Sequence, residues 1–267
     1  MTQKPWQLRA VLVGAWTGLL FLLLPILITI PASFTPTNYF AIPALDDMSL
    51  AQYRNVLTPI WLGSIGQSLV IGLGTTLLSC IMGTLAAIGL WRVASGYTNL
   101  LLGAMLMPLI VPPVVTALGM NSVWHRLGLF DSYLGTVIAH TTWAAPFVVI
   151  TVYTALSNVD RTLEKAARSL GASPGRTVRD VLIPGAMPGV LAGAVFAFIT
   201  SWDEVVLTLF VTSRRINTLP KQTFTAVRDN TDPTVAAVAS LLIGLTFVAV
   251  AIKLVLSLRG SRPASPS

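Results

Sequence analysis

The chain has 267 residues, of which 54% are hydrophobic and only 10% are charged, and its mean hydropathy is +0.76. Soluble domains carry about 25% charged residues, so this composition indicates an integral membrane protein and excludes disordered, collagen-like and disulfide-rich scaffolds. Uncharged runs this long also exclude an outer-membrane barrel, whose strands alternate in polarity over about ten residues. The single cysteine, Cys80, excludes an intrachain disulfide and a cysteine-cluster metal site.

Six apolar windows each match the ~20 residues that a helix needs to cross ~30 Å of hydrocarbon. Five contain no charged residue, and the remaining one, 187–211, contains two. They predict an all-α polytopic membrane protein with six transmembrane helices in a single domain, residues 1–267. The first window is too long for a secretory signal and lacks a convincing cleavage site, so we interpret it as a retained span. The windows are 10–30, 63–90, 100–123, 134–156, 187–211 and 234–252.

The net charge of +7 reflects membrane topology rather than nucleic-acid binding, since a basic excess marks the cytoplasmic side of a membrane protein. With the N-terminus and the C-terminus inside, eleven of the 17 lysine and arginine residues face the cytoplasm. Six face outward, and four of them crowd the loop 212–233, which is an anomaly under this rule. The outward six are Arg54, Arg126, Arg214, Arg215, Lys221 and Arg228.

The third window contains Pro108, Pro112 and Pro113. Proline removes a backbone donor, so this span is expected to be bent or broken. Broken spans line the pathways of transporters, but prolines also occur in ordinary membrane helices, and both interpretations stay open here.

The loop between the fourth and fifth windows, residues 157–186, carries clear helix boundaries. Asp160 can cap a helix, Gly171 can supply the left-handed residue that ends it, and Ser173 can cap a second helix that Pro184 should end. Two short helices joined by a tight bend are therefore predicted outside the membrane. Three uses are open: a plain surface helix, a helix-turn-helix for DNA, which the two flanking spans disfavour, or docking of a partner.

This loop resembles the EAA motif of permease subunits of ATP-binding-cassette importers. Lys165 occupies the position of the motif's glutamate, and Glu164 precedes it. A shift of one residue turns a helical side chain by about 100°, so Glu164 does not simply replace that glutamate. The positions that match the motif are Ala166, Ala167, Gly171, Val181, Ile183 and Pro184. The resemblance implies that these residues, together with Glu164 and Lys165, form the site of coupling to the ATPase.

The resemblance implies a non-catalytic transport subunit in the bacterial cytoplasmic (inner) membrane, whose loop is a coupling helix seated on a separate ATPase. Its implied partners are two ATP-binding-cassette subunits, a second homologous permease, an extracytoplasmic solute-binding protein and the lipid bilayer, with no nucleic acid. The sequence lacks the GxxxxGK[ST] loop that cradles nucleotide phosphates, so we expect no cofactor in this chain, with ATP and Mg²⁺ bound by the ATPase. Transport would proceed by alternating access.

Asp203 and Glu204 are the only acids within the predicted spans, where an ionised group costs several kcal/mol unless it is paired or wetted. A rise of about 1.5 Å per residue puts Asp203 in the outer half of the fifth span, at a depth comparable to that of His140. These acids form either a structural pair or part of a pathway for a cationic solute. His140 alone is typical of an interhelical hydrogen-bonding group.

The stretch SWDEVVLTLF, followed by TLP, resembles the second permease of spermidine and putrescine importers, which implies polyamine transport. Asp203, Glu204, Trp202 and His140 are therefore the predicted pathway residues, with no metal site. Either Trp202 or Trp143 would contact the cation through its ring. The alternative is a self-sufficient cation channel or secondary carrier, which the coupling-loop spacing disfavours. An intramembrane enzyme is disfavoured because HExxH is absent and the two scattered histidines offer no evident metal site.

Overall fold

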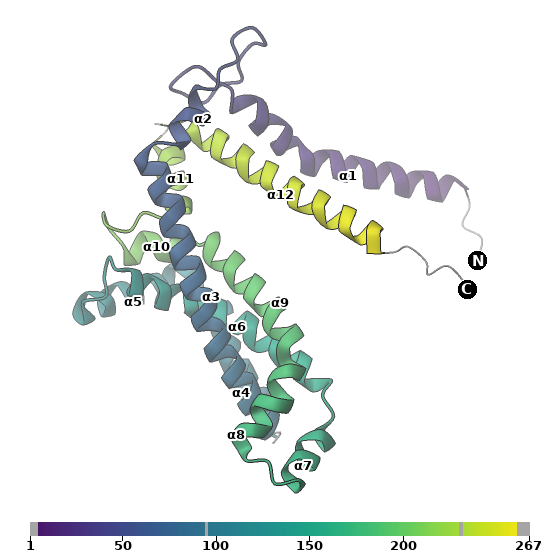
Figure 1. The fold of residues 1–267 in the computed structure, drawn as a ribbon. Helices are drawn as coiled ribbons and strands as arrows, with labels where there is room; N and C mark the ends of the chain where they lie inside the picture. The colour runs from purple at the N-terminus through teal and green to yellow at the C-terminus, as the bar shows by residue number, and fades with distance from the viewer. Residues whose placement is uncertain (1–4, 94–95, 230–231, 261–267) are drawn as a thin grey trace. The chain divides into compact units, whose positions relative to one another are not determined.

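The computed structural model describes residues 5–93, 96–229 and 232–260, and throughout these ranges the regular structure is helical (Figure 1). The chain divides into two compact units: residues up to Leu62 together with those from Thr223 onward, and residues Gly63–Gln222. The prediction of one domain over 1–267 stays a prediction. The elements are α1 (Pro5–Ala32), α2 (Ala51–Val56), α3 (Pro59–Val93), α4 (Thr98–Leu106), the 3₁₀ turn η1 (Met107–Leu109), α5 (Pro113–Leu127), α6 (Tyr133–Ser157), α7 (Arg161–Ser169), α8 (Pro174–Thr177), the π-helical turn η2 (Val178–Leu182), α9 (Ile183–Trp202), α10 (Val206–Val211), α11 (Leu219–Arg228) and α12 (Thr234–Gly260).

Five of the described helical segments are long and apolar enough to cross a membrane. The third predicted span is instead divided into Thr98–Leu109 and Pro113–Leu127, which meet at an angle of 85°. This confirms the expected break at the prolines. Pro112 lies between the two parts in an extended conformation (φ −55°, ψ 135°), and Pro113 begins the second helix, where its missing N–H costs no intrahelical bond. The five unbroken segments are Val11–Ala32, Pro59–Val93, Tyr133–Ser157, Pro174–Trp202 and Thr234–Ser257.

Contacts around α7 decide whether this divided segment crosses the membrane. The helix α7 directly follows α6, and its residue Arg161 bonds to Trp91 at the end of α3. Helices α3 and α6 therefore end on the same side. The chain between them must cross back once, so α4, η1 and α5 together form one broken span rather than a re-entrant loop. Six spans result, as the sequence predicts.

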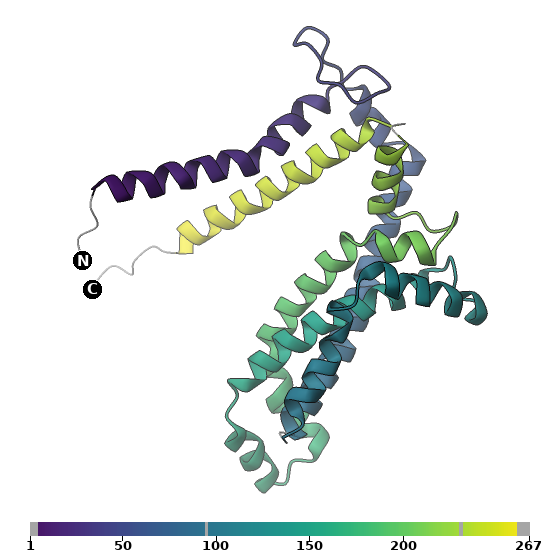
Figure 2. The same ribbon diagram turned by 180° about the vertical axis from the view of Figure 1, so that it is seen from behind.

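The core of the second unit is the contact between α6 and α9, which lie side by side in Figures 1 and 2. A Cβ atom built on Gly189 would lie 2.8 Å from Cβ of Ala155 and 2.8 Å from Cα of Val152. Only glycine allows the two backbones to approach this closely, as in other membrane helix pairs that use small residues four apart. Gly193 makes the next such contact, against Val148.

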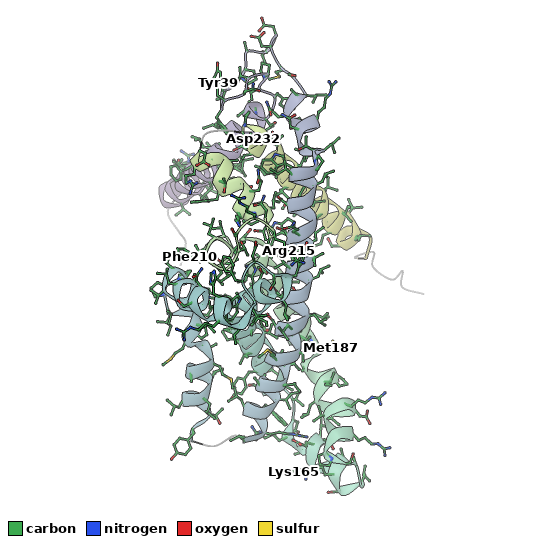
Figure 3. The ribbon with its side chains drawn as sticks, turned by 90° about the vertical axis from the view of Figure 1, so that its left-hand side faces the viewer. Tyr39, Lys165, Met187, Phe210, Arg215 and Asp232 are labelled. Atoms are coloured by element: carbon green, nitrogen blue, oxygen red, sulfur yellow. The ribbon has the colours of Figure 1, made fainter. Side chains whose placement is uncertain are left out.

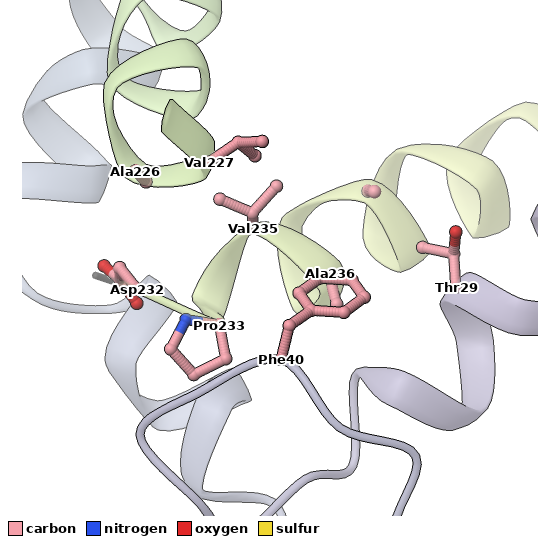
Figure 4. A pocket seen from close by; sticks show the side chains of 9 residues that line it. Thr29, Phe40, Ala226, Val227, Asp232, Pro233, Val235 and Ala236 are labelled. Atoms are coloured by element: carbon pink, nitrogen blue, oxygen red, sulfur yellow. The ribbon is translucent and has the colours of Figure 1, made fainter. Parts of the chain in front are cut away.

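In the first unit, α1 and α12 lie side by side and run in opposite directions (Figures 1 and 2). Asp232 organises the start of α12: it accepts a hydrogen bond from the indole N–H of Trp61 (2.9 Å) and one from the backbone N–H of Thr234 (2.9 Å). Asp232, Phe40 and Ala236 are among the residues that line an apolar pocket of about 320 Å³ (Figure 4). The acid is therefore committed to capping the last span.

Two boundaries around the fifth span differ from the sequence prediction. Pro184 does not end a helix: η2 widens the turn before it, Pro184 occupies the first turn of α9, and Pro174–Trp202 forms one continuous span. At the other end the helix stops at Trp202 rather than continuing to Val211, and a separate short helix, α10, follows. The predicted span 187–211 is therefore wrong in its outer part.

Candidate functional site

In the loop between α6 and α9, the first helix, the bend and the start of the second helix form as their boundary residues predict, whereas the second helix continues through Pro184 into α9. The Asp160 carboxylate caps α7 by accepting a hydrogen bond from the backbone N–H of Thr162 (2.8 Å), and the Ser173 hydroxyl caps α8 by accepting one from Arg176 (3.3 Å). Gly171 has a φ of +83°, a left-handed conformation that side chains other than glycine's disfavour. Bonds from the Thr162 backbone and hydroxyl, followed by the field of Lys165, lower the pKa of the Asp160 carboxyl.

The helix α7 has two opposite faces. Its charged residues fall three and four apart and form one stripe: Arg161, Glu164, Lys165 and Arg168. Its apolar residues form the other stripe, Leu163, Ala166 and Ala167, which Leu170 extends directly after the helix. Leu163 is 53% exposed and Leu170 is 89% exposed, so nothing in the described chain covers the apolar face.

The charged face of α7 is held against the end of the second span. The Arg161 guanidinium donates to the carbonyl oxygen of Trp91 (2.7 Å) and lies 4.7 Å from the centre of its ring. Glu164 forms an ion pair with Arg92 (2.8 Å). Glu164, predicted as a docking residue, therefore joins α7 to α3. Ile183 and Pro184, from the same prediction, lie at the start of α9 and not on α7.

Figure 3 shows Lys165 at one end of the second unit and Phe210 and Arg215 near the other. The membrane-spanning helices α3, α6 and α9 connect these two ends. The loop that resembles a coupling site and the break in the fifth span thus lie at opposite ends of one helical unit.

At that break, the two neighbouring acids have different environments. The Glu204 carboxylate accepts a hydrogen bond from the backbone N–H of Leu207 (2.8 Å) and caps α10. Asp203 is exposed, and its carboxylate has no hydrogen bond or ion pair within the described residues. The acids do not form a structural pair, and Asp203 is the one left available to a ligand.

His140 and Trp202 are both used within the protein. His140 is buried, and its Nδ1 and Nε2 atoms lie 2.8 Å and 3.0 Å from the hydroxyl oxygens of Ser201 and Thr208. The imidazole thereby joins α6 to both sides of the break. Trp202 stacks on Phe198, with ring centres 5.6 Å apart. His140 therefore fits the interhelical interpretation that the sequence left open.

The sequence gives no warning of Asp131, which organises the outer loop. Its carboxylate accepts four hydrogen bonds of 2.9 to 3.1 Å from consecutive backbone N–H groups, and its own backbone is left-handed (φ 53°). Burial alone would raise the pKa of the Asp131 carboxyl, but these N–H donors outweigh it and lower the pKa. The donors belong to Ser213, Arg214, Arg215 and Ile216.

The same loop explains the excess of basic residues outside. Lys221 donates to the Thr212 hydroxyl (2.8 Å) and to the carbonyl oxygen of Ser213 (2.7 Å), and burial lowers the pKa of its ammonium group. Arg228 pairs with Asp229 (2.9 Å). Two of the four anomalous cations are thus committed within the protein, and Arg214 and Arg215 stay exposed on a loop that Asp131 fixes.

Comparison with known proteins identifies the family. Residues 80–260 match the family described as "binding-protein-dependent transport system inner membrane component". The spermidine/putrescine permease protein PotC of Escherichia coli (strain K12) is 32% identical over 69% of this chain and 70% of its own. The putrescine permease protein PotI of the same strain is 28% identical over 91% and 88%. The trehalose permease protein SugB of Mycobacterium tuberculosis (strain CDC 1551 / Oshkosh) is 29% identical over 73% and 72%.

Solved structures share the fold. A chain of a bacterial alginate ABC transporter, crystallised with an alginate pentasaccharide-bound periplasmic protein, matches with a TM-score of 0.67 at 16% identity over 92% of each chain. A chain of an amino acid ABC transporter matches with a TM-score of 0.53 at 18% identity, covering 76% of this chain and 96% of that one. Helical topology is therefore shared well beyond the range of sequence similarity.

Proposed function

The chain belongs to the family of binding-protein-dependent transport system inner membrane components, and from this premise we propose that it imports a polyamine such as spermidine or putrescine. Membership makes it a multi-pass, non-catalytic permease of the inner membrane, in an importer that works with a binding protein. The proposal adds the substrate and the parts of the chain that serve it. The partners proposed are ATP-binding-cassette subunits, a second homologous permease and an extracytoplasmic binding protein.

The proposed class of substrate rests on the environment of Asp203. It is an exposed carboxylate without a partner in the described chain, at a place where a membrane span is interrupted. Interrupted spans bind substrates in transporters, because unwound backbone is tolerated where it lines a cavity. A polyamine exchanges its hydration for contacts with carboxylates and aromatic rings, and Asp203 supplies such a carboxylate.

The relatives include permeases named for polyamines and one named for a sugar. PotC and PotI carry polyamine names, whereas SugB, at similar identity, carries the name of a neutral sugar. Trehalose has no charge for an isolated carboxylate to attract. The free Asp203 therefore favours a cation over a sugar.

The coupling part of the proposal rests on α7. Its apolar face, formed by Leu163, Ala166, Ala167 and Leu170, docks on the ATPase, while Arg161 and Glu164 hold its charged face to the end of α3. Movement of the ATPase then reaches α3 through α7, and reaches α9 through the continuous helical segment Pro174–Trp202. Alternating access follows as these spans reorient.

Uptake of labelled spermidine and labelled trehalose by cells expressing the whole importer tests the substrate. Asp203→Asn should lower spermidine uptake at least about tenfold, because it removes one charge-assisted contact with the substrate. A tenfold change corresponds to about 1.4 kcal/mol. Expression and assembly should be unchanged, because the Asp203 side chain bonds to nothing in the described structure. The neighbouring variant Glu204→Gln, which keeps an oxygen to cap α10, is the matched control. Normal spermidine uptake by Asp203→Asn, or uptake of trehalose alone by the unaltered importer, contradicts the proposal.

A further inference from the structure

A basic pocket of about 340 Å³ lies between the end of α3 and the charged face of α7. Four cationic side chains line it against a single carboxylate, which gives the lining a net charge of +3. This pocket is separate from the break at Asp203 and from the apolar face of α7. The lining residues are Arg92, Arg161, Glu164, Lys165, Arg168 and Pro174.

Internal contacts do not use up the positive charge of this pocket. Glu164 is neutralised by Arg92, and Arg161 is engaged by the carbonyl oxygen and ring of Trp91, neither of which carries a charge. Lys165 and Arg168 form no ion pair within the part of the chain that the structure describes, although Lys165 contributes to the field at Asp160.

One donor of a pocket-lining side chain is also unsatisfied. The Nε atom of Arg92 is buried and has no hydrogen-bond partner among the described residues, while the same side chain reaches Glu164 and the Pro174 carbonyl oxygen (3.4 Å) through another nitrogen. A buried donor without a partner is costly, and an acceptor bound in the pocket would satisfy it once a shift of the Arg92 side chain exposes the Nε atom. Together with Lys165 and Arg168, Arg92 offers the combination of fork and point charge that recognises phosphate.

Position indicates the source of the phosphate. Trp91 and Arg92 occupy the last turn of a membrane span, on the side that the lysine and arginine distribution assigns to the cytoplasm. Lipid headgroups lie at this level, and basic pockets at the cytoplasmic ends of membrane helices bind anionic headgroups. The apolar face of α7 points the opposite way, so an ATPase docked there leaves the pocket open towards the membrane surface.

We propose that this pocket binds the phosphate of an anionic phospholipid headgroup, which would fix the angle between α7 and α3. The proposal depends on the membrane topology and not on the identity of the transported solute. The volume lies within the range of small-molecule sites, about 300–1,000 Å³. Lys165, at the position where the resembling motif has glutamate, would then serve a lipid rather than the ATPase.

The test uses the full-length protein, purified in detergent and incubated with phosphatidylglycerol or with phosphatidylcholine, and native mass spectrometry to count retained lipids. The variant is Lys165→Gln with Arg168→Gln. The control, Arg176→Gln with Arg179→Gln, removes the same charge from exposed positions in the same loop but outside the pocket. Both variants should fold, because all four side chains are exposed.

The expected result is retention of phosphatidylglycerol by the unaltered protein and the control, and retention weaker by at least about tenfold in the pocket variant. Phosphatidylcholine should be retained weakly by all three, and millimolar inorganic phosphate should not displace phosphatidylglycerol. Equal retention by all three proteins overturns the proposal. Displacement of phosphatidylglycerol by inorganic phosphate would overturn the proposal that the ligand is a lipid, and would indicate a free anion instead. A photocrosslink from position 165 to a carboxylate of the ATPase would also overturn it, and would indicate that the pocket docks a protein.

Discussion

Asp131 offers the sharpest structural test, because a single carboxylate holds four consecutive backbone N–H groups of the outer loop. Asp131→Asn keeps the left-handed backbone accessible, since asparagine tolerates that conformation. It replaces one carboxylate oxygen with an NH₂ group that faces two N–H donors instead of accepting from them. The groups affected are those of either Arg214 and Arg215, which bond to one oxygen, or Ser213 and Ile216, which bond to the other.

The magnitude follows from the number of lost bonds. A hydrogen bond to a charged group contributes about 1.5–3 kcal/mol, and two are lost, but the site is partly exposed and water replaces part of the interaction. A net loss of about 2–3 kcal/mol in the local opening free energy is expected. This corresponds to exchange of the four amides faster by about 30–150-fold.

Hydrogen exchange with mass spectrometry on the peptide that covers 212–218 measures this directly. Asp180→Asn is the control, because Asp180 is exposed and makes no hydrogen bond or ion pair in the described chain. Protection of these amides from exchange should also persist from neutral pH to about pH 5, because the Asp131 carboxylate stabilises the loop only while it is ionised. Protection should weaken as the pH falls through the pKa of Asp131, which lies below the ordinary value of 3.8. Unchanged exchange in Asp131→Asn would refute the assigned role.

Two glycine substitutions test the other structural claims. Gly171→Val forces a β-branched residue to a φ of +83°, at a cost of about 1–2 kcal/mol or more. This variant should abolish substrate-stimulated ATP hydrolysis while the importer still assembles. Normal stimulation would count against a role of the bend in coupling. Gly189→Val should destabilise the α6–α9 pair enough to reduce the yield of folded protein on size-exclusion chromatography, because its side chain meets Val152 and Ala155. Gly244→Val, which meets nothing within 4 Å, is the control and should behave as the unaltered protein; equal yields would rule out the close contact.

Features set by local sequence could be predicted, and features set by distant contacts could not. The spans follow from long uncharged runs, and the caps at Asp160 and Ser173 follow from residue types next to a helix start. The fold class and the broken third span were therefore within reach. The predicted helix end at Pro184 is wrong because the widened turn η2 allows the helix to continue through this proline. The sequence of η2 gives no signal of such a turn.

The break after Trp202 lacks a local signal, since no proline or glycine lies there. It is stabilised by Glu204, which caps the next helix, and by His140, which reaches it from α6 across a separation of 61 residues. Asp131 is similarly remote, more than 80 residues from its loop. One readable signal was missed: glycines at 185, 189 and 193 recur every fourth residue, the spacing of closely packed membrane helices.

We propose that a separate ATPase drives the permease through the apolar face of α7, which no described residue covers. A photocrosslinking amino acid at position 170, whose leucine is 89% exposed, tests it in native membrane vesicles. Position 127, where Leu127 is 63% exposed at the end of α5, provides the comparison. Position 170 should capture an ATP-binding-cassette subunit, identified by mass spectrometry, and position 127 should not. Failure of position 170 to capture that subunit, in vesicles that retain ATP-driven uptake, would contradict it.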